Sequence, residues 1–151
     1  MSSMGSDFAS VWSRVTGMRP AEDELTKLRR WMGDETEELR AYEMILRSSL
    51  PNQVRETLSS ILRDKRRHMK ELQTLYYLRT GDVWNLPKPG DRRKQPLMKA
   101  LRERYAAAIS LAVSYRDCAA EQRDLASLCA ALAQDEDTLA MKLRSLIKRL
   151  L

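Results

Sequence analysis

Apolar side chains recur along this chain at steps of three and four residues, which is the period of one face of an α-helix. Residues 21–47 and 53–79 keep this period throughout, as do a segment that begins near Pro96 and a segment at residues 125–150. A shorter amphipathic pattern covers residues 7–15. Gly and Pro number only five each, so little interrupts helix formation. The sequence therefore predicts an all-α protein with four long helices and a short N-terminal helix.

The connections between these helices differ in length. Residues 48–52 form a short turn after the first long helix, and we place another short turn at residues 119–122. Residues 80–96 contain two glycines and three prolines and form a loop that is long for a compact domain. A loop of this length can run along a bundle and join two parallel helices, which a short turn cannot do. We therefore expect an N-terminal segment at residues 1–20, followed by one four-helix domain at residues 21–151.

Charged or polar side chains interrupt the apolar stripes of three helices near their middles. Glu35 interrupts the first stripe, and Lys65 and His68 interrupt the second. Glu136 interrupts the last stripe. A buried carboxylate costs roughly several kcal/mol unless a partner compensates its charge, so these side chains are the candidate functional residues. The first stripe consists of Leu25, Leu28, Met32, Glu35, Leu39, Tyr42 and Leu46.

The two halves of the chain repeat each other. Residues 63–75 align with residues 134–146, and Tyr42 aligns with Tyr115. In this alignment the polar interruptions of the two halves fall at matching depths along the helices. Each half is therefore expected to be a helical hairpin, and the two hairpins are expected to follow the same plan.

Two helical hairpins, each with a short turn, are expected here to be joined by a long crossover loop. This connectivity resembles the ferritin-like superfamily, and rubrerythrin-type proteins in particular. The resemblance covers about residues 25–151, apart from the central loop. It implies a ferritin-like four-helix bundle with a crossover loop between the second and third helices. In di-iron members, the first and third helices each contribute a glutamate, often seven residues before a tyrosine, and the other two helices each contribute Glu-x-x-His. Carboxylate oxygens and imidazole nitrogens together hold the two iron ions.

Carried over by position, the resemblance implies a degenerate di-iron site. Tyr42 and Tyr115 keep the tyrosine positions behind the site. The pattern supports the fold better than it supports di-iron activity. Three ligand positions keep a residue that can bind metal, namely Glu35, His68 and Glu136. The other three positions carry replacements for glutamate, glutamate and histidine, namely Lys65, Ala108 and Leu139.

Two interpretations of Lys65 remain open. Its ammonium group can snorkel to water at the edge of the bundle. Alternatively, it lies between Glu35 and Glu136, where the metals would be, and donates hydrogen bonds to both carboxylates. His68 is likewise either a hydrogen-bonded core histidine or a metal ligand. We expect both tyrosines to be core residues whose hydroxyl groups reach across the bundle.

The net charge of +6 is partly concentrated in and beside the central loop, where Arg92, Arg93 and Lys94 follow one another. Arg-rich helix exteriors are ordinary, but a nucleic acid or another anionic partner could also bind this loop. No apolar run approaches the ~20 residues of a membrane span, so we expect no membrane partner. Cys118 and Cys129 are expected on successive helices and match no metal motif. We therefore expect a cytoplasmic protein with reduced cysteines. We also expect a bacterial source.

The sequence contains no recognisable catalytic constellation, because it has a single histidine and no glycine-rich phosphate loop. Three classes of function remain. The first is a bundle that has lost di-iron catalysis, needs no cofactor and acts through association, as a homodimer. The second is a rubrerythrin-like oxidoreductase that binds iron or another divalent metal at the reduced site. The third is a protein that binds nucleic acid or another anionic partner through the basic loop.

Overall fold

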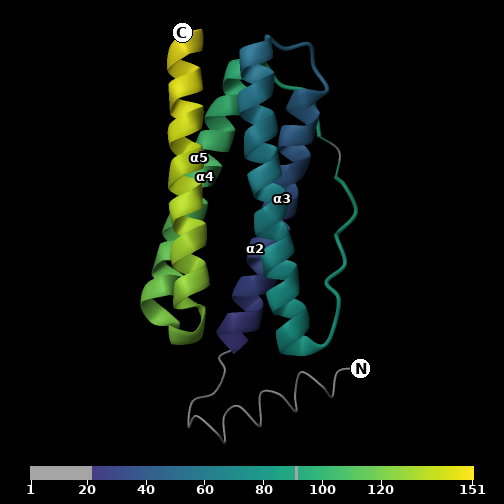
Figure 1. The fold of residues 1–151 in the computed structure, drawn as a ribbon. Coiled ribbons are helices and arrows are strands. Elements are labelled where there is room, and N and C mark those ends of the chain that lie inside the picture. The colour runs from purple at the N-terminus through teal and green to yellow at the C-terminus, as the bar shows by residue number, and fades with distance from the viewer. Residues whose placement is uncertain (1–21, 91) are drawn as a thin grey trace, which may run out of the picture. The chain divides into compact units, whose positions relative to one another are not determined.

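The computed structural model describes residues 22–90 and 92–151. In these residues the chain forms four α-helices and one 3-10 turn, without a strand, which confirms the predicted helical bundle (Figure 1). The short helix predicted at residues 7–15 lies outside the described residues. The helices are α2 (Glu22–Leu46), α3 (Asn52–Thr80), α4 (Leu97–Glu121) and α5 (Ala126–Leu150), and the 3-10 turn is η1 (Arg123–Leu125).

The predicted helix boundaries agree with the structure to within a few residues, except at the last turn. Helix α4 continues to Glu121, so the turn predicted at residues 119–122 is wrong and lies instead at residues 122–125. Gln122 adopts an extended backbone conformation with φ −114° and ψ 99°. Leu125 is almost fully buried at the end of η1. No glycine or proline marks this turn in the sequence, and the burial of Leu125 anchors it instead.

Contacts divide the described chain into two compact units, and α2 and α3 contribute to both. The first unit contains residues 22–39 and 64–90. In this unit α2 and α3 are linked by an ion pair, in which Nε of Arg79 lies 3.1 Å from Oε1 of Glu24. The carboxylate of Glu24 is nearly buried, so Arg79 compensates a charge that would otherwise be costly there.

The second unit contains residues 40–63 and 92–151. Its helices α4 and α5 pack against each other as an antiparallel hairpin (Figure 1). An exposed ion pair between Arg116 and Asp137 links the two helices on their outer side. Cys118 and Cys129 link them on the buried side, so the prediction that these cysteines lie on successive helices is confirmed.

The turn between α2 and α3 also belongs to the second unit and is held by Arg55. The guanidinium group of Arg55 donates hydrogen bonds to the carbonyl oxygens of Leu46, at 2.9 Å, and of Ser48, at 2.8 Å. Leu46 is the last residue of α2, where carbonyl groups lack partners within the helix. Arg55 therefore caps α2 with a positive charge and fixes the path of the turn.

The buried face of α2 is shifted from the predicted stripe. Leu25, Leu39 and Leu46 are only half-buried. Glu24 and Glu38 lie on the buried face instead, with 5% and 4% of their surface exposed. The predicted period is correct and the predicted stripe is confirmed in part, because Leu28, Met32, Glu35 and Tyr42 are fully buried. The buried face includes Glu24, Leu28, Trp31, Glu35, Glu38, Tyr42 and Ile45, at alternating steps of four and three.

Residues 81–90 and 92–96 form neither helix nor strand, in agreement with the predicted loop. Gly81 ends α3 with a φ of 76°, a conformation that favours glycine, and its N–H donates a hydrogen bond to the carbonyl oxygen of Tyr77 at 2.7 Å. The crossover role of the loop stays a prediction. Among the described helices, none combines the length and the apolar character that crossing a bilayer requires.

Candidate functional site

Glu35 and Lys65 form an ion pair inside the first unit. Glu35 lies in the middle of α2 and Lys65 in the middle of α3, and Nζ of Lys65 donates a hydrogen bond to Oε1 of Glu35 at 2.9 Å. Only 1% of the Lys65 side chain and none of the Glu35 side chain is exposed. Lys65 therefore does not snorkel to water, and it is a buried counter-ion of Glu35. Its predicted contact with Glu136 stays a prediction.

Each member of this pair needs the other to be stable in the core. Each charge loses several kcal/mol of hydration, roughly, when it leaves water. A short, charge-assisted hydrogen bond in a poorly polarisable interior offsets much of that loss. Replacing such a pair by apolar side chains is often neutral, whereas removing one member leaves an uncompensated buried charge. Glu35 and Lys65 are thus stable in the core together, and neither is stable there alone.

His68 lies one helical turn after Lys65 on α3 and therefore faces the same side of the helix. Its Nδ1 lies 3.8 Å from Oε2 of Glu35, and its side chain is buried. This distance is longer than a hydrogen bond, and the contact is an ion pair only when the imidazole is protonated. Glu35 thus directs one carboxylate oxygen to Lys65 and the other towards His68.

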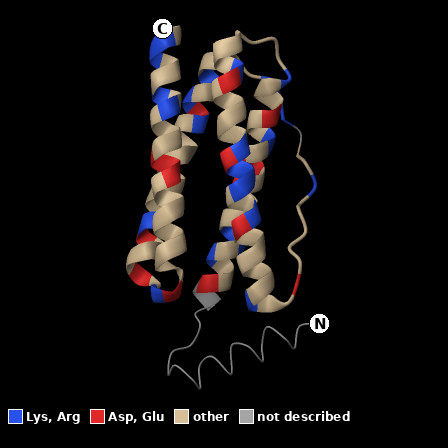
Figure 2. Ribbon diagram, in the orientation of Figure 1, with Lys and Arg blue, Asp and Glu red and all other residues tan. Residues whose placement is uncertain are grey.

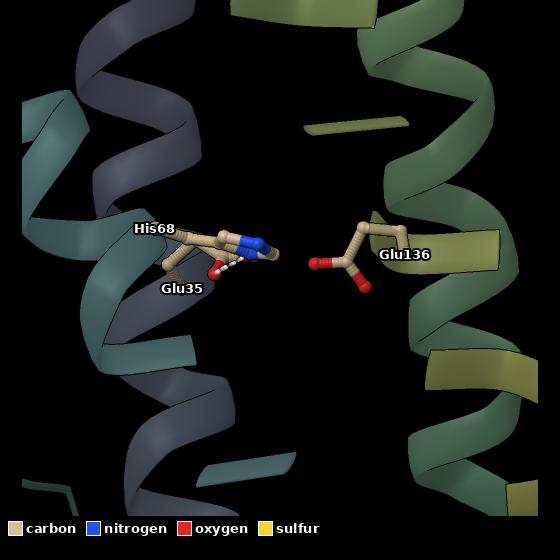
Figure 3. Close-up of side chains that lie close together, drawn as sticks. All are labelled: Glu35, His68 and Glu136. Atoms are coloured by element: carbon tan, nitrogen blue, oxygen red, sulfur yellow. Dashed lines mark ion pairs between the residues drawn. The ribbon is translucent and has the colours of Figure 1, made fainter. Parts of the chain in front are cut away.

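Glu136 comes from α5 and is fully buried. Glu35, His68 and Glu136 each offer one possible ligand atom, and these atoms lie within 4.8 Å of one another (Figure 3). Two carboxylates and one imidazole form a donor set that suits divalent ions such as zinc or iron. The three residues could therefore hold one metal ion, although Lys65 already occupies one oxygen of Glu35.

The other positions implied by the resemblance offer no metal ligand. Ala108 on α4 and Leu139 on α5 are 1% and 3% exposed, and both side chains are apolar. Tyr42 and Tyr115 are fully buried, as expected of core residues. Apolar side chains thus stand at the two positions where the resemblance implies a glutamate and a histidine. A pair of iron ions would lack half of its ligands here.

Two buried acidic residues escaped the sequence analysis, namely Glu24, which pairs with Arg79, and Glu38. Glu38 is buried although it lies only three residues after Glu35. A stripe continued from Leu28 and Glu35 by alternating steps of four and three would have included Glu38. Asp34 is different, because its side chain is exposed. Partial desolvation raises the pKa of the Asp34 carboxyl above its usual value, while the positive charge of Arg30 opposes this shift.

The chain was compared with protein-family models, curated proteins and solved structures, and none of the three comparisons gave a match. The resemblance to ferritin-like proteins therefore rests on this chain's own residues, their spacing and the helical fold. The buried ion pair is independent of that resemblance, because it follows from the positions of Glu35 and Lys65 alone.

We predict that Lys65→Met strongly destabilises the protein, because it leaves the Glu35 carboxylate buried without its counter-ion. The free energy of unfolding, measured by urea titration at neutral pH, should fall by about 3–5 kcal/mol. Combining Lys65→Met with Glu35→Leu should recover most of this loss, because the second change removes the uncompensated charge.

Lys70→Met is the matched control, because Lys70 is an exposed lysine on the same helix. This variant should lie within about 0.5 kcal/mol of the wild type. Equal effects of Lys65→Met and Lys70→Met would show that the ion pair does not stabilise the core.

Proposed function

We propose that this chain is a ferritin-like helical bundle in which an internal ion pair has taken the place of the metal centre, so that the protein acts through association instead of di-iron catalysis. The observation that carries the proposal is the buried contact between Lys65 and Glu35. By the resemblance, position 65 is a ligand position that requires a carboxylate. A lysine there supplies a positive charge where the family binds positive metal ions.

Charge explains why a lysine and a metal ion compete for this site. An ammonium group 2.9 Å from Glu35 already compensates that carboxylate. A divalent ion bound to the same carboxylate would face a positive charge at short range, in an interior that screens it poorly. Metal binding would therefore require Lys65 to lose its proton or to leave the core. Both events are unfavourable and would weaken metal binding, and an intact di-iron site requires neither of them.

A second candidate is a protein that binds a single metal ion and has rubrerythrin-like redox activity. The observation that favours it is the grouping of Glu35, His68 and Glu136, which offer three suitable donor atoms. This candidate needs Lys65 to be displaced when the ion binds. Metal content and metal-dependent stability separate the two candidates directly.

We predict that the wild-type protein gains no thermal stability from zinc, manganese or anaerobic ferrous ions, and that it contains no stoichiometric metal after dialysis. The triple variant Lys65→Glu, Ala108→Glu and Leu139→His should be less stable in chelator, because it adds charge to the core. Added metal should then raise its melting temperature, since a ligand bound only to the folded state stabilises that state by about 2.7 kcal/mol at 100 times its Kd.

Lys65→Glu alone keeps this test informative if the triple variant fails to fold, and Lys70→Glu is its surface control. A gain of stability with one metal ion per wild-type chain would overturn the proposal in favour of the second candidate. A folded triple variant that does not respond to metal would contradict the positions inherited from the di-iron pattern.

Association would use apolar surface, and the first unit exposes it. Leu78 and Val83 are 71% and 73% exposed, and Tyr77 and Leu86 are more than half exposed. Large exposed apolar side chains concentrated in one stretch of chain are typical of contact surfaces. The commonest such contact in soluble proteins joins two copies of the same chain around a two-fold axis, which supports a homodimer.

We predict that the wild-type protein is a dimer by sedimentation velocity and that Leu78→Asp with Val83→Asp makes it monomeric, because carboxylates on the contact surface would have to be desolvated. Met141→Asp is the control, since Met141 is an apolar residue 59% exposed on α5. A monomeric wild type, or a dimer unaffected by the double change, would contradict this assignment.

A further inference from the structure

A pocket of about 530 Å³ lies within the second unit, apart from the buried ion pair. Its walls come from the end of α2, the turn between α2 and α3, residues 92–95 and the first two turns of α4. This volume falls in the range of roughly 300–1,000 Å³ that is typical of small-molecule sites. Segments about fifty residues apart in the sequence thus combine to form one concave surface.

The polar part of this pocket is strongly basic. Four of its lining residues are cationic, namely Arg92, Arg93, Lys94 and Arg104, and none of the described lining residues is acidic. Figure 2 shows the basic residues of the segment that precedes α4. Helix α4 begins at Leu97, another lining residue, without a side-chain cap and without an acidic residue in its first turn. The positive end of its dipole therefore adds to the field of the cations.

The remaining wall of the pocket is apolar and aliphatic. Ala41, Met44 and Ile45 contribute from α2, Leu50 from the turn, and Ala100 from α4. None of the described lining residues is aromatic, so the pocket offers no ring on which a nucleobase could stack. Methionine adapts its flexible side chain to aliphatic groups of different shapes. The wall therefore favours an aliphatic group over a nucleotide base.

The turn that forms one side of the pocket is fixed before any ligand arrives. Arg55 holds the carbonyl oxygens of Leu46 and Ser48, and Ser48 lines the pocket together with Ser49. A preformed wall lowers the entropy that binding loses. Arg55 is not a lining residue of the pocket. Its guanidinium group stabilises the turn, whereas the four cationic lining residues border the pocket.

We propose that this pocket binds a small phosphorylated aliphatic molecule, with the phosphate against the cations and the aliphatic group against the α2 wall. A doubly charged phosphate matches several adjacent cations better than a singly charged carboxylate does. Arginine forks bind phosphate oxygens in pairs, and lysine adds a point charge. The site requires neither the metal nor the ion pair, so it goes beyond the proposed function and its test is independent.

The experiment is isothermal titration calorimetry with n-hexyl phosphate, inorganic phosphate, hexanoate and hexanol as probes. Hexyl phosphate should bind at one site per chain and at least about tenfold more tightly than the other three, because only it uses both parts of the pocket. Raising the salt concentration should weaken this binding, since ions screen the contact with the cations.

Two variants locate the site. Arg93→Gln with Lys94→Gln should weaken hexyl phosphate binding by about tenfold or more, because it removes the two exposed cations among the described lining residues. Lys99→Gln with Arg102→Gln removes the same charge from exposed α4 positions that do not line the pocket, and it should change the affinity less than about threefold.

Met44→Gln distinguishes the apolar wall from the cations. It should reduce the advantage of hexyl phosphate over inorganic phosphate and leave the affinity for inorganic phosphate unchanged. The proposal is overturned if hexyl phosphate does not bind, if it binds no more tightly than phosphate or hexanoate, or if the Lys99 and Arg102 control weakens it equally. Tighter binding of a short single-stranded oligonucleotide, lost in the same pocket variant, would assign the surface to nucleic acid instead.

A second, independent observation concerns the two cysteines of the hairpin between α4 and α5. Sγ of Cys129 and Sγ of Cys118 lie 2.9 Å apart, and both side chains are buried. Cys118 is in the last turn of α4 and Cys129 in the first turn of α5, on either side of residues 122–125. Helix ends open more readily than helix centres, so a small oxidant can reach this pair through local opening of the turn.

The geometry points to a reversible disulfide site. One thiolate attacks a low-molecular-weight disulfide, such as oxidised glutathione, and releases one small thiol. The other cysteine then attacks the mixed disulfide and releases the second small thiol. The protein thus loses two electrons and two protons, and the small disulfide is reduced to two thiols. The new bond closes the turn between α4 and α5.

The test is incubation of the folded protein with oxidised glutathione, followed by mass spectrometry and thiol titration in denaturant. The protein should lose the mass of two hydrogen atoms, have no titratable thiol and melt at a higher temperature, because the cross-link constrains the unfolded chain. Cys118→Ser is the control and should retain a glutathione adduct on Cys129. Two titratable thiols after oxidation, or disulfide-linked dimers on a non-reducing gel, would overturn the assignment.

Discussion

The contact between Lys65 and Glu35 is the constraint on which the interior of the first unit depends. Each residue brings a charge into a helix face that is otherwise built for apolar packing, and each is acceptable there because the other lies 2.9 Å away. The contact also fixes how α2 and α3 are placed relative to each other in this unit, because an apolar stripe tolerates small sliding, whereas a hydrogen-bonded ion pair tolerates little. His68, one turn further along α3, is thereby brought close to the second oxygen of Glu35.

Much of the fold could be predicted from the sequence, since helical periodicity is a local property that each segment carries by itself. The helix predicted at residues 53–79 is confirmed as α3, and its buried residues from Val54 to Leu72 keep the helical period. The whole buried face of α2 could not be predicted by counting apolar residues, because Glu24 is buried beside a partner, Arg79, that lies more than fifty residues away. The final turn was misplaced for a related reason, since Leu125 marks it by burial and not by residue type.

The candidate site, like the fold, could be predicted in part from local sequence patterns, and the rest depends on contacts between distant segments. Interruptions of apolar stripes identified Glu35, Lys65, His68 and Glu136, and all four are buried. Whether Lys65 snorkels or stays inside depends on the direction of a flexible side chain, which spacing along a helix does not determine. Only one part of the pocket could be predicted from the sequence. Arg92, Arg93 and Lys94 stood out as a basic run, but its apolar wall and Arg104 come from other segments and join it only in the folded chain.

Cationic side chains have opposite roles in the core and in the pocket. In the core, Lys65 has lost its hydration and pairs with the Glu35 carboxylate, so its charge stabilises the fold. In the pocket, Arg93 and Lys94 are exposed and lie among cations without an acidic lining residue, so their field extends towards solvent. A ligand that approaches from water meets the second arrangement and not the first. The proposed replacement of a metal centre in the core and the proposed anion site at the surface are therefore compatible, because a buried, paired cation and an exposed cation act differently.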